Sequence, residues 1–308
     1  MKEPILGHLS PVAKLIFVFL LVITCFVIFF LVGILLAIPL FHIDLFKDIS
    51  VYSDYHNPDS VPILKYLQII QSISIFILPA LLAGFFYGGN SGYYLGMNKT
   101  SGGRIFFATL LIMFVSIPMI TWATSLNEMM KLPDFLKGIE DWMKETEDQA
   151  AGLTESFLNV DSAGGLLVNL LIIAIIPSIG EELFFRGLLQ RLFSEWFRNV
   201  HIAIFFTAFL FAAIHLQFYG FLPRMLLGIL FGYLFVWTGS IWIPVFAHFL
   251  NNGSAVILSF LINRGTISSG YEDFGATENL FLIAISVLFT GGLLYMVYRT
   301  SIHKESEF

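Results

Sequence analysis

The feature of this sequence that most limits its fold is a series of apolar runs, each close to the length that spans a bilayer. They cover residues 15–41, 64–87, 105–125, 166–193, 202–218, 221–237, 241–262 and 279–298. A hydrocarbon core needs about 20 apolar residues in helical conformation. Lipid offers no partner to a free backbone group, so open strand edges are excluded. The runs predict an all-α polytopic membrane protein with about eight transmembrane helices.

Composition agrees with a membrane protein and argues against other classes. Apolar residues make up 57% of the chain and charged residues 12%, about half the charged fraction of a soluble domain. The net charge of -6 argues against a nucleic-acid partner. The single cysteine, Cys25, lies in the first run, which excludes a disulfide framework and a thiolate metal cluster.

The longest polar stretch lies between the third and fourth runs, at residues 128–165. In it, Phe135, Ile139, Trp142 and Met143 recur at helical spacing with acidic residues between them. This pattern predicts an amphipathic helix that lies on the membrane.

The loops between the runs predict the topology. An even number of spans puts both termini on one side, and a modest excess of Lys and Arg in the short loops makes that side cytoplasmic. Because the chain is short and its loops are compact, we expect a multi-pass protein of the bacterial inner membrane.

The ionisable side chains that stand out lie inside three of the runs. Each costs at least about 2.5–3.5 kcal/mol on insertion scales, and such residues usually mark function. Together with one neighbouring carboxamide they are Glu181, Glu182, Arg186, His215, His248 and Asn252.

Spacing within this set predicts which members meet. Glu182 and Arg186 are four residues apart, so they share a helix face and can pair. His248 and Asn252 have the same spacing.

The fourth and fifth runs should form an antiparallel hairpin. Glu181 precedes the turn at Arg198 by as many residues as His215 follows it. The two side chains should therefore reach the same depth, roughly 25 Å from the turn. Pro177 and Gly180, just before the glutamates, should bend or loosen the fourth helix.

Two carboxylates, two imidazoles and a carboxamide in a dry cavity suit peptide hydrolysis. A carboxylate or imidazole can take a proton from attacking water, and an imidazole or amide N–H can stabilise the oxyanion. The alternative is a metal, since one Glu with two His is a zinc ligand set. Spacing leaves both chemistries open. A purely structural ion pair would account for Glu182 with Arg186 but leaves the second carboxylate, Glu181, unexplained.

Three motifs in order, Glu181-Glu182-x-x-x-Arg186, Phe211-x-x-x-His215 and His248-x-x-x-Asn252, resemble the CPBP intramembrane protease family. That family includes type II CAAX prenyl endopeptidases and bacteriocin-processing, Abi-like enzymes. The stretch TGSIWIPVFAHFLNN, residues 238–252, is similar to its third motif region. The resemblance covers about residues 166–261.

The resemblance implies an intramembrane endopeptidase that cuts a membrane-associated, prenylated or otherwise apolar peptide by water attack. It implies that Glu181 and His215 activate the water. It implies that His248 and Asn252 stabilise the oxyanion. It also implies that Glu182 and Arg186 pair and fix the geometry of Glu181.

The family is often labelled metalloprotease, yet a metal-free glutamate mechanism is argued for its CAAX members. We favour the metal-free version because an Asn amide is a better oxyanion donor than a zinc ligand. In the Zn²⁺-dependent version, Glu181, His215 and His248 are the ligands.

Within one structural unit, we place the first three spans and the amphipathic connector in residues 1–165 and the catalytic core in residues 166–308. The expected partners are membrane lipid and an apolar or membrane-associated peptide. Two other functions use the same residues: a non-catalytic immunity or partner-binding protein on this scaffold, and a proton- or cation-coupled transporter. The lack of an internal repeat counts against the transporter.

Overall fold

The computed structural model describes residues 3–43, 54–271 and 274–305. Within these ranges the chain forms helices and loops and no strand, which confirms the all-α prediction. Six helices are long and apolar enough to cross a membrane: Pro11–Phe41, Val61–Gly88, Ala163–Phe197, Phe218–Thr238, Trp242–Asn263 and Leu280–Ser301.

The two remaining predicted spans are less regular. The third is a pair of helices, α5 (Gly103–Val115) and α6 (Ile117–Glu128), bent by 43° and counted as a seventh span if taken together. The fifth is α11 (Val200–Ala213), which has 14 residues and is about 21 Å long. Each of the eight predicted runs is thus a helix or a helix pair, but at most seven are long enough to span.

The remaining helix labels name either a whole span, a part of a span or a connecting helix. They are α1 (Pro11–Phe41), α2 (Val61–Ser72), α3 (Leu78–Gly88), α4 (Ser91–Tyr94), α7 (Lys137–Leu158), α8 (Ala163–Asn169), α9 (Ile176–Glu182), α10 (Gln190–Phe197), α12 (Phe221–Thr238), α13 (Trp242–Asn263) and α14 (Leu280–Glu305).

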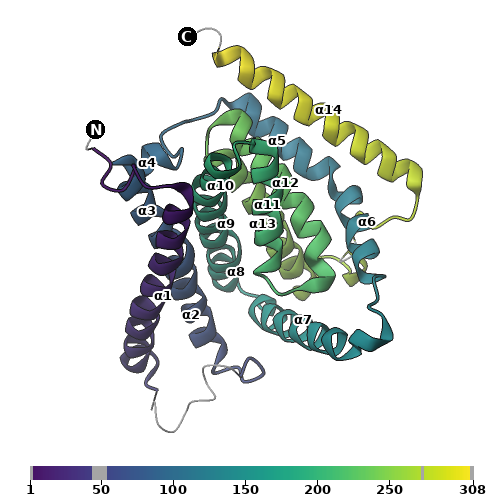
Figure 1. Ribbon diagram of the computed structural model, residues 1–308. Coiled ribbons are helices and arrows are strands. Elements are labelled where there is room, and N and C mark those ends of the chain that lie inside the picture. Colours follow the sequence, from purple (N-terminus) through teal and green to yellow (C-terminus); the bar gives the residue numbers. More distant parts are fainter. Residues whose placement is uncertain (1–2, 44–53, 272–273, 306–308) are drawn as a thin grey trace.

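In space the helices form a central group with a flank on each side. α9, α11, α12 and α13 lie in the middle, α1 to α3 form one flank, and α14 runs along the other (Figure 1). Both termini lie at one end of the molecule (Figure 1). α7 lies across the opposite end (Figure 1).

The helix α8–α10 carries the glutamates and is continuous from Ala163 to Phe197. Two π-helical segments interrupt its regular winding, Leu170–Ile175 before Pro177 and Leu183–Leu189 after Glu182. The expected loosening therefore takes the form of π-helical turns. Gly180 serves close packing instead, because a Cβ there would lie 3.0 Å from Ile77 Cγ1.

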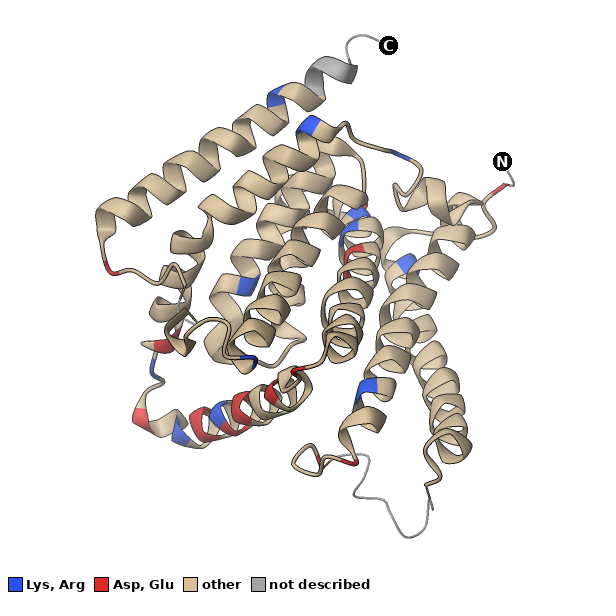
Figure 2. Cartoon of the chain, turned by 180° about the vertical axis from the view of Figure 1, so that it is seen from behind, with Lys and Arg blue, Asp and Glu red and all other residues tan. Residues whose placement is uncertain are grey.

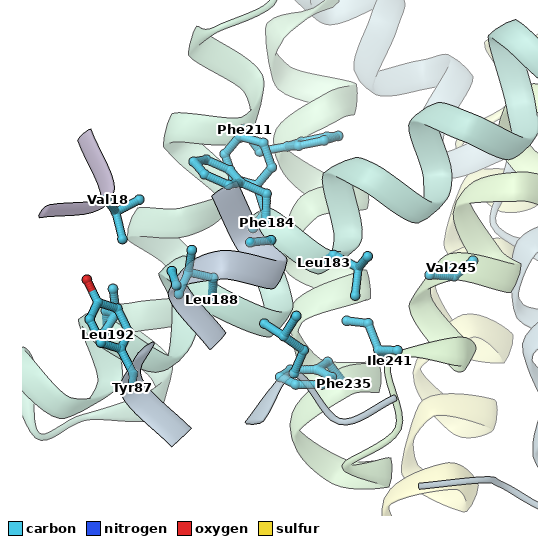
Figure 3. Close-up of a cluster of buried hydrophobic side chains, with 14 residues drawn as sticks. Val18, Tyr87, Leu183, Phe184, Leu188, Leu192, Phe211, Phe235, Ile241 and Val245 are labelled. Atoms are coloured by element: carbon cyan, nitrogen blue, oxygen red, sulfur yellow. The ribbon is translucent and has the colours of Figure 1, made fainter. Parts of the chain in front are cut away.

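A cluster of buried hydrophobic side chains holds this helix in place. Leu183, Phe184 and Leu188 pack with Phe211 of α11 and Phe235 of α12 (Figure 3). The cluster reaches the polar residues directly, because Phe211 also contacts His215 with ring centroids 5.0 Å apart.

The predicted amphipathic helix is confirmed as α7. Acidic residues recur along it at intervals (Figure 2). Its residue Trp142 contacts Phe218, with ring centroids 5.3 Å apart. Glu147 Oε2 accepts a hydrogen bond from the Tyr219 backbone N–H at 3.1 Å. These contacts attach α7 to the loop between α11 and α12.

Candidate active site

Glu182 and Arg186 form the ion pair that their spacing predicted. Arg186 Nη1 donates to Glu182 Oε1 at 2.8 Å, and both side chains are fully buried. Arg186 Nη2 also donates to the backbone oxygen of Gly228 at 3.2 Å. Its guanidinium lies 4.5 Å from the Phe211 ring centroid and 5.4 Å from that of Phe231. The buried cation thus contacts a carboxylate, a carbonyl and two aromatic faces, while its Nε has no hydrogen-bond partner among the described residues.

The same Glu182 oxygen fixes His248. His248 Nδ1 lies 2.9 Å from Glu182 Oε1. A carboxylate only accepts hydrogen bonds, so Nδ1 carries the proton. The opposite nitrogen, Nε2, lies 3.2 Å from Asn252 Nδ2 and accepts from that amide. The ring of Phe231 stacks on the imidazole at a centroid distance of 5.5 Å.

The side-chain amide of Asn252 bonds to a backbone oxygen shortly before the proline that precedes the glutamates. Its Nδ2 donates to the backbone oxygen of Ile173 at 3.1 Å. Ile173 stands four residues before Pro177, and proline has no N–H to donate to that carbonyl. Pro177 therefore leaves an acceptor that Asn252 uses. Both N–H bonds of the amide are occupied in this arrangement.

His215 lies outside the helix in which the sequence placed it. The fifth run was expected to extend to residue 218, but α11 ends at Ala213. Leu216 has a φ of 52°, a left-handed conformation that stops the helix. The last carbonyls of a helix lack partners within it. His215 Nδ1 donates to one of them, Phe211 O, at 2.7 Å.

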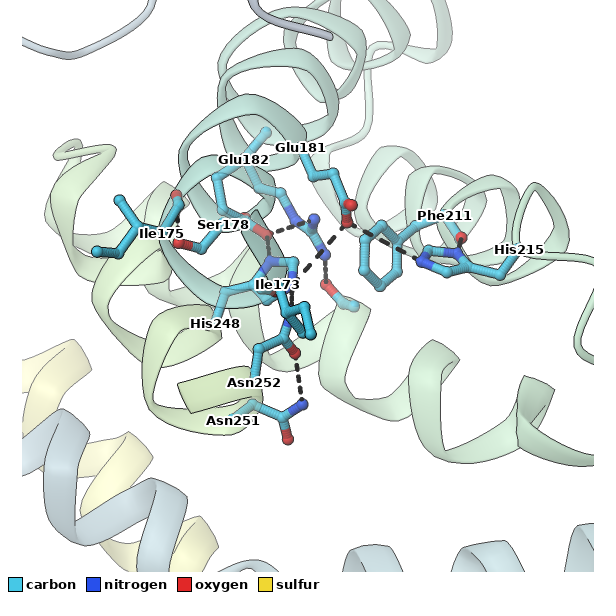
Figure 4. Close-up of polar contacts among 12 residues, drawn as sticks. Ile173, Ile175, Ser178, Glu181, Glu182, Phe211, His215, His248, Asn251 and Asn252 are labelled. Atoms are coloured by element: carbon cyan, nitrogen blue, oxygen red, sulfur yellow. Dashed lines mark hydrogen bonds and ion pairs between the residues drawn. The ribbon is translucent and has the colours of Figure 1, made fainter. Parts of the chain in front are cut away.

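Glu181 is the point on which the two imidazoles converge (Figure 4). Its Oε2 lies 4.0 Å from His215 Nε2 and 3.9 Å from His248 Nε2. This oxygen is buried and has no hydrogen-bond partner among the described residues. The expected equal depth of Glu181 and His215 is confirmed. The hairpin turn also lies at Arg198, whose φ is 53°.

A cavity of about 450 Å³ opens beside these groups. Glu181, His215, His248 and Asn252 line it together with apolar residues of α12 and α13. One wall comes from α7, through Leu153, Thr154, Phe157 and Leu158, and another residue, Gln68, comes from α2. The structure thus brings all six predicted site residues together, with Glu182 and Arg186 behind the cavity wall.

Sequence reasoning missed a second cation at this site. Arg224, in the first turn of α12, also lines the cavity. A signal was present: Arg224, Leu227 and Phe231 follow each other at helical spacing on one face. Amphipathic spacing gives no information on what a helix covers, so the place of α7 in the cavity wall comes from the structure.

The donor set resembles a zinc site in kind but not in spacing. Both histidines donate Nδ1–H to an acceptor and turn Nε2 toward Glu181, as metal-binding histidines do. Ligands of tetrahedral zinc at about 2.1 Å from the ion lie about 3.4 Å apart, whereas these nitrogens lie 3.9 and 4.0 Å from the carboxylate oxygen. Among the described residues, no three His, Cys, Asp or Glu side chains are close enough to hold a metal as they stand.

All six residues fall within one segment that has known relatives. Residues 163–254 match the type II CAAX prenyl endopeptidase Rce1-like family. The Rce1-like segment begins with the first residue of α8 and ends two residues beyond Asn252. The resemblance in the motifs is confirmed for this segment of the chain.

A curated relative extends the same comparison. The chain is 27% identical over 86 residues to the uncharacterized protein YpbD of Bacillus subtilis (strain 168). The match covers 27% of this chain and 41% of YpbD, so the chain spans about two fifths of that relative's length. No solved structure matches the chain.

Proposed function

We propose that the protein is an intramembrane endopeptidase that hydrolyses a peptide bond in a membrane-associated or otherwise apolar substrate. The observation that carries this proposal is the unpartnered, buried Oε2 of Glu181, which faces Nε2 of both His215 and His248 at the cavity wall. The similarity of residues 163–254 to the Rce1-like family supports a protease of the CAAX type.

We place the attacking water between Glu181 Oε2 and the imidazole nitrogens. A water about 2.8 Å from each of two atoms that lie 3.9–4.0 Å apart would bridge them at an angle of about 90°. Glu181 accepts one proton of this water as its oxygen bonds to the substrate carbonyl carbon. His215 accepts the other hydrogen bond and so orients the attacking lone pair. Protonated Glu181 then donates its proton to the leaving nitrogen as the C–N bond breaks.

The oxyanion requires donors, which His248 and Asn252 supply in a different protonation state. In the arrangement described, His248 Nε2 accepts from Asn252 and cannot donate. A proton on Nε2 makes His248 an imidazolium, whose charge Glu182 stabilises through Nδ1. It also releases the amide of Asn252. In the proposed mechanism Glu181 therefore acts as the base, and His248 and Asn252 act as the donors to the oxyanion.

In the zinc-dependent alternative, Glu181, His215 and His248 would hold the ion. Zinc would supply a Lewis acid and an activated water. In this version too, Glu182 and the Phe211 carbonyl would orient the two imidazoles through their Nδ1 atoms.

The experiment is a cleavage assay on protein purified in mild detergent, with a library of quenched apolar peptides. Glu181→Gln should lower kcat by about 10²–10⁴-fold, the range of general-base catalysis. The matched control is Glu145→Gln, which changes an exposed carboxylate on α7. Wild-type rates in Glu181→Gln would contradict the proposal.

Metal analysis of the same samples separates the two mechanisms. Cleavage by metal-free protein that disappears in Glu181→Gln would support the water-activating base. One zinc per chain, with activity lost on chelation and restored by zinc, would support the metal version. No cleavage of any peptide, together with cation flux in proteoliposomes that Glu181→Gln abolishes, would instead indicate a transporter.

A further inference from the structure

Arg224 is a cation inside the cavity for which the proposed reaction has no use. It lies in the first turn of α12, and it lines the same cavity as Glu181, His215 and His248. Its Nη1 donates to the Gln217 backbone oxygen at 3.4 Å, and its Nη2 donates to Gln217 Oε1. Arg224 is thus tied to the loop that carries His215.

The guanidinium keeps unused donors. It has five N–H bonds, and the two bonds to Gln217 leave three of them free. In the described part of the chain no carboxylate forms an ion pair with Arg224. Glu147 of α7 lies at the same loop, but its Oε2 accepts from the Tyr219 N–H. Arg224 is half-buried and lines the cavity, and its Nε is not one of the buried atoms that lack a hydrogen-bond partner.

The separation of Arg224 and Phe231 along α12 gives an estimate of the distance between Arg224 and the bond that is cut. Phe231, which stacks on His248, lies seven residues further along α12. Seven residues of helix correspond to about 10 Å. His215, which faces Glu181, lies two residues from Gln217, to which Arg224 is bonded, so the path along this loop is short as well. An extended peptide advances about 3.3 Å per residue, so this distance corresponds to two or three residues.

We propose that Arg224 determines specificity by binding a carboxylate of the substrate two or three residues from the bond that is cut. An Arg fork accepts a carboxylate through two parallel N–H bonds. The carboxylate comes either from a chain terminus or from an Asp or Glu side chain. Apart from Arg224, the cavity is lined by uncharged residues, the two histidines and Glu181. This inference rests on the proposed endopeptidase function.

The test uses matched peptides that differ only in one charge. One pair has a C-terminal acid or amide three residues after the cleaved bond. A second set has Glu or Gln two, three or six residues from that bond in an amidated peptide. Wild type should cleave a peptide with a well-placed carboxylate at least tenfold faster in kcat/KM than its neutral partner, as expected for charge-assisted hydrogen bonds. At six residues the ratio should be near one. A preference in the first pair identifies a C-terminal carboxylate as the recognised group, and a preference in the second set identifies a side-chain carboxylate.

Variants separate recognition from a merely structural role. Arg224→Gln should reduce the acid-to-amide ratio of kcat/KM to about one. Arg224→Lys should retain part of the preference, since it keeps the charge but loses the fork. Lys137→Gln, at an exposed cation of α7, should preserve the ratio.

Three results are distinguishable. If Arg224→Gln and Arg224→Lys slow both peptides equally and keep the ratio, Arg224 only supports the His215 loop and the inference is wrong. If wild type cleaves acid and neutral peptides at the same rate, the inference is wrong while the endopeptidase function stands. If wild type cleaves none of the peptides and none of the wider library, the proposed function itself fails.

Discussion

At the scale of single residues, Glu182 explains why two adjacent carboxylates are present. Its Oε1 accepts from Arg186 on its own helix and from His248 on α13. This one oxygen therefore sets the position of Arg186 and the tautomer of His248. Glu181 forms no such bond through Oε2, and its free oxygen remains directed at the cavity.

Arg186→Ala tests the importance of this pair for stability. The substitution leaves the Glu182 carboxylate buried without its cation, which costs about 3–5 kcal/mol. We expect low yield of folded protein and a lowered Tm in detergent, together with lost cleavage. Arg104→Ala, at an exposed arginine of α5, is the matched control. An unchanged Tm in Arg186→Ala would contradict the pairing.

Short-range spacing predicted part of this site well. The pairing of Glu182 with Arg186 follows from helical periodicity, and so does the contact of His248 with Asn252. The equal distances from Arg198 predicted that Glu181 meets His215. Arg224 was missed because its function depends on which helices surround it, and local periodicity does not contain that information. The acceptor that Pro177 leaves for Asn252 was missed for the same reason.

At the scale of helices, close approach of α12 to α11 and α10 depends on small residues. Gly228 and Gly232 stand four residues apart on α12, and both pack closely against neighbouring helices. A Cβ at Gly228 would lie 2.9 Å from Ala208 Cβ, and one at Gly232 would lie 2.8 Å from Ile204 Cγ2. The backbone oxygens of both glycines accept hydrogen bonds from side chains of the α8–α10 helix, Arg186 and Gln190.

Gly228→Ala should therefore destabilise the protein. The added methyl forces α11 and α12 apart and weakens the bond from Arg186, and overpacking of this kind costs about 1–3 kcal/mol. Gly291→Ala is a matched control, because a Cβ at Gly291 has no neighbour within 4 Å. Alanine is favoured over glycine in helices, so its Tm should stay the same or rise. Thermal unfolding in one detergent compares the two. Equal Tm changes would contradict the packing argument.

The C-terminal end of α7 is held by side chains from three other helices. The last carbonyls of a helix have no partner within it. Phe157 O accepts from Lys65 Nζ at 2.9 Å and from Asn169 Nδ2 at 2.7 Å. Leu158 O accepts from Asn263 Nδ2 at 2.9 Å. Because Phe157 and Leu158 line the cavity, these bonds fix one of its walls.

Removal of this attachment should loosen α7 without unfolding the bundle. We expect faster amide hydrogen exchange over residues 150–158 in Asn169→Ala and Lys65→Met, with exchange in α12 unchanged. Lys137→Met, at the free N-terminal end of α7, provides the comparison. If the two variants exchanged like wild type over residues 150–158, the attachment would have no role in holding α7.

At the scale of the whole molecule, the arrangement of the termini tests the topology. The two ends of the chain lie at one end of the structure and α7 lies at the other (Figure 1). The prediction that the termini are cytoplasmic can be examined with a single-cysteine method, since Cys25 is the only cysteine and is buried.

In a Cys25→Ser background, His8→Cys and Thr300→Cys should react with a membrane-impermeant thiol reagent only from the cytoplasmic side. Lys144→Cys on α7 should react only from the opposite side. The expectation follows from the even number of crossings and the excess of Lys and Arg in the short loops near the termini. Labelling of His8→Cys and Thr300→Cys from different sides would show that one predicted span, α11 first among them, does not cross.

The α7 wall of the cavity has a consequence for how such a protein can diversify. The groups proposed for chemistry lie between residues 163 and 254, whereas Gln68, Leu153, Thr154 and Phe157 reach the same cavity from outside that segment. These lining residues can therefore be exchanged while the groups proposed to activate water stay unchanged. Grafting residues 137–158 from one homologue onto another would test whether the proposed substrate choice can be transferred separately from the proposed chemistry.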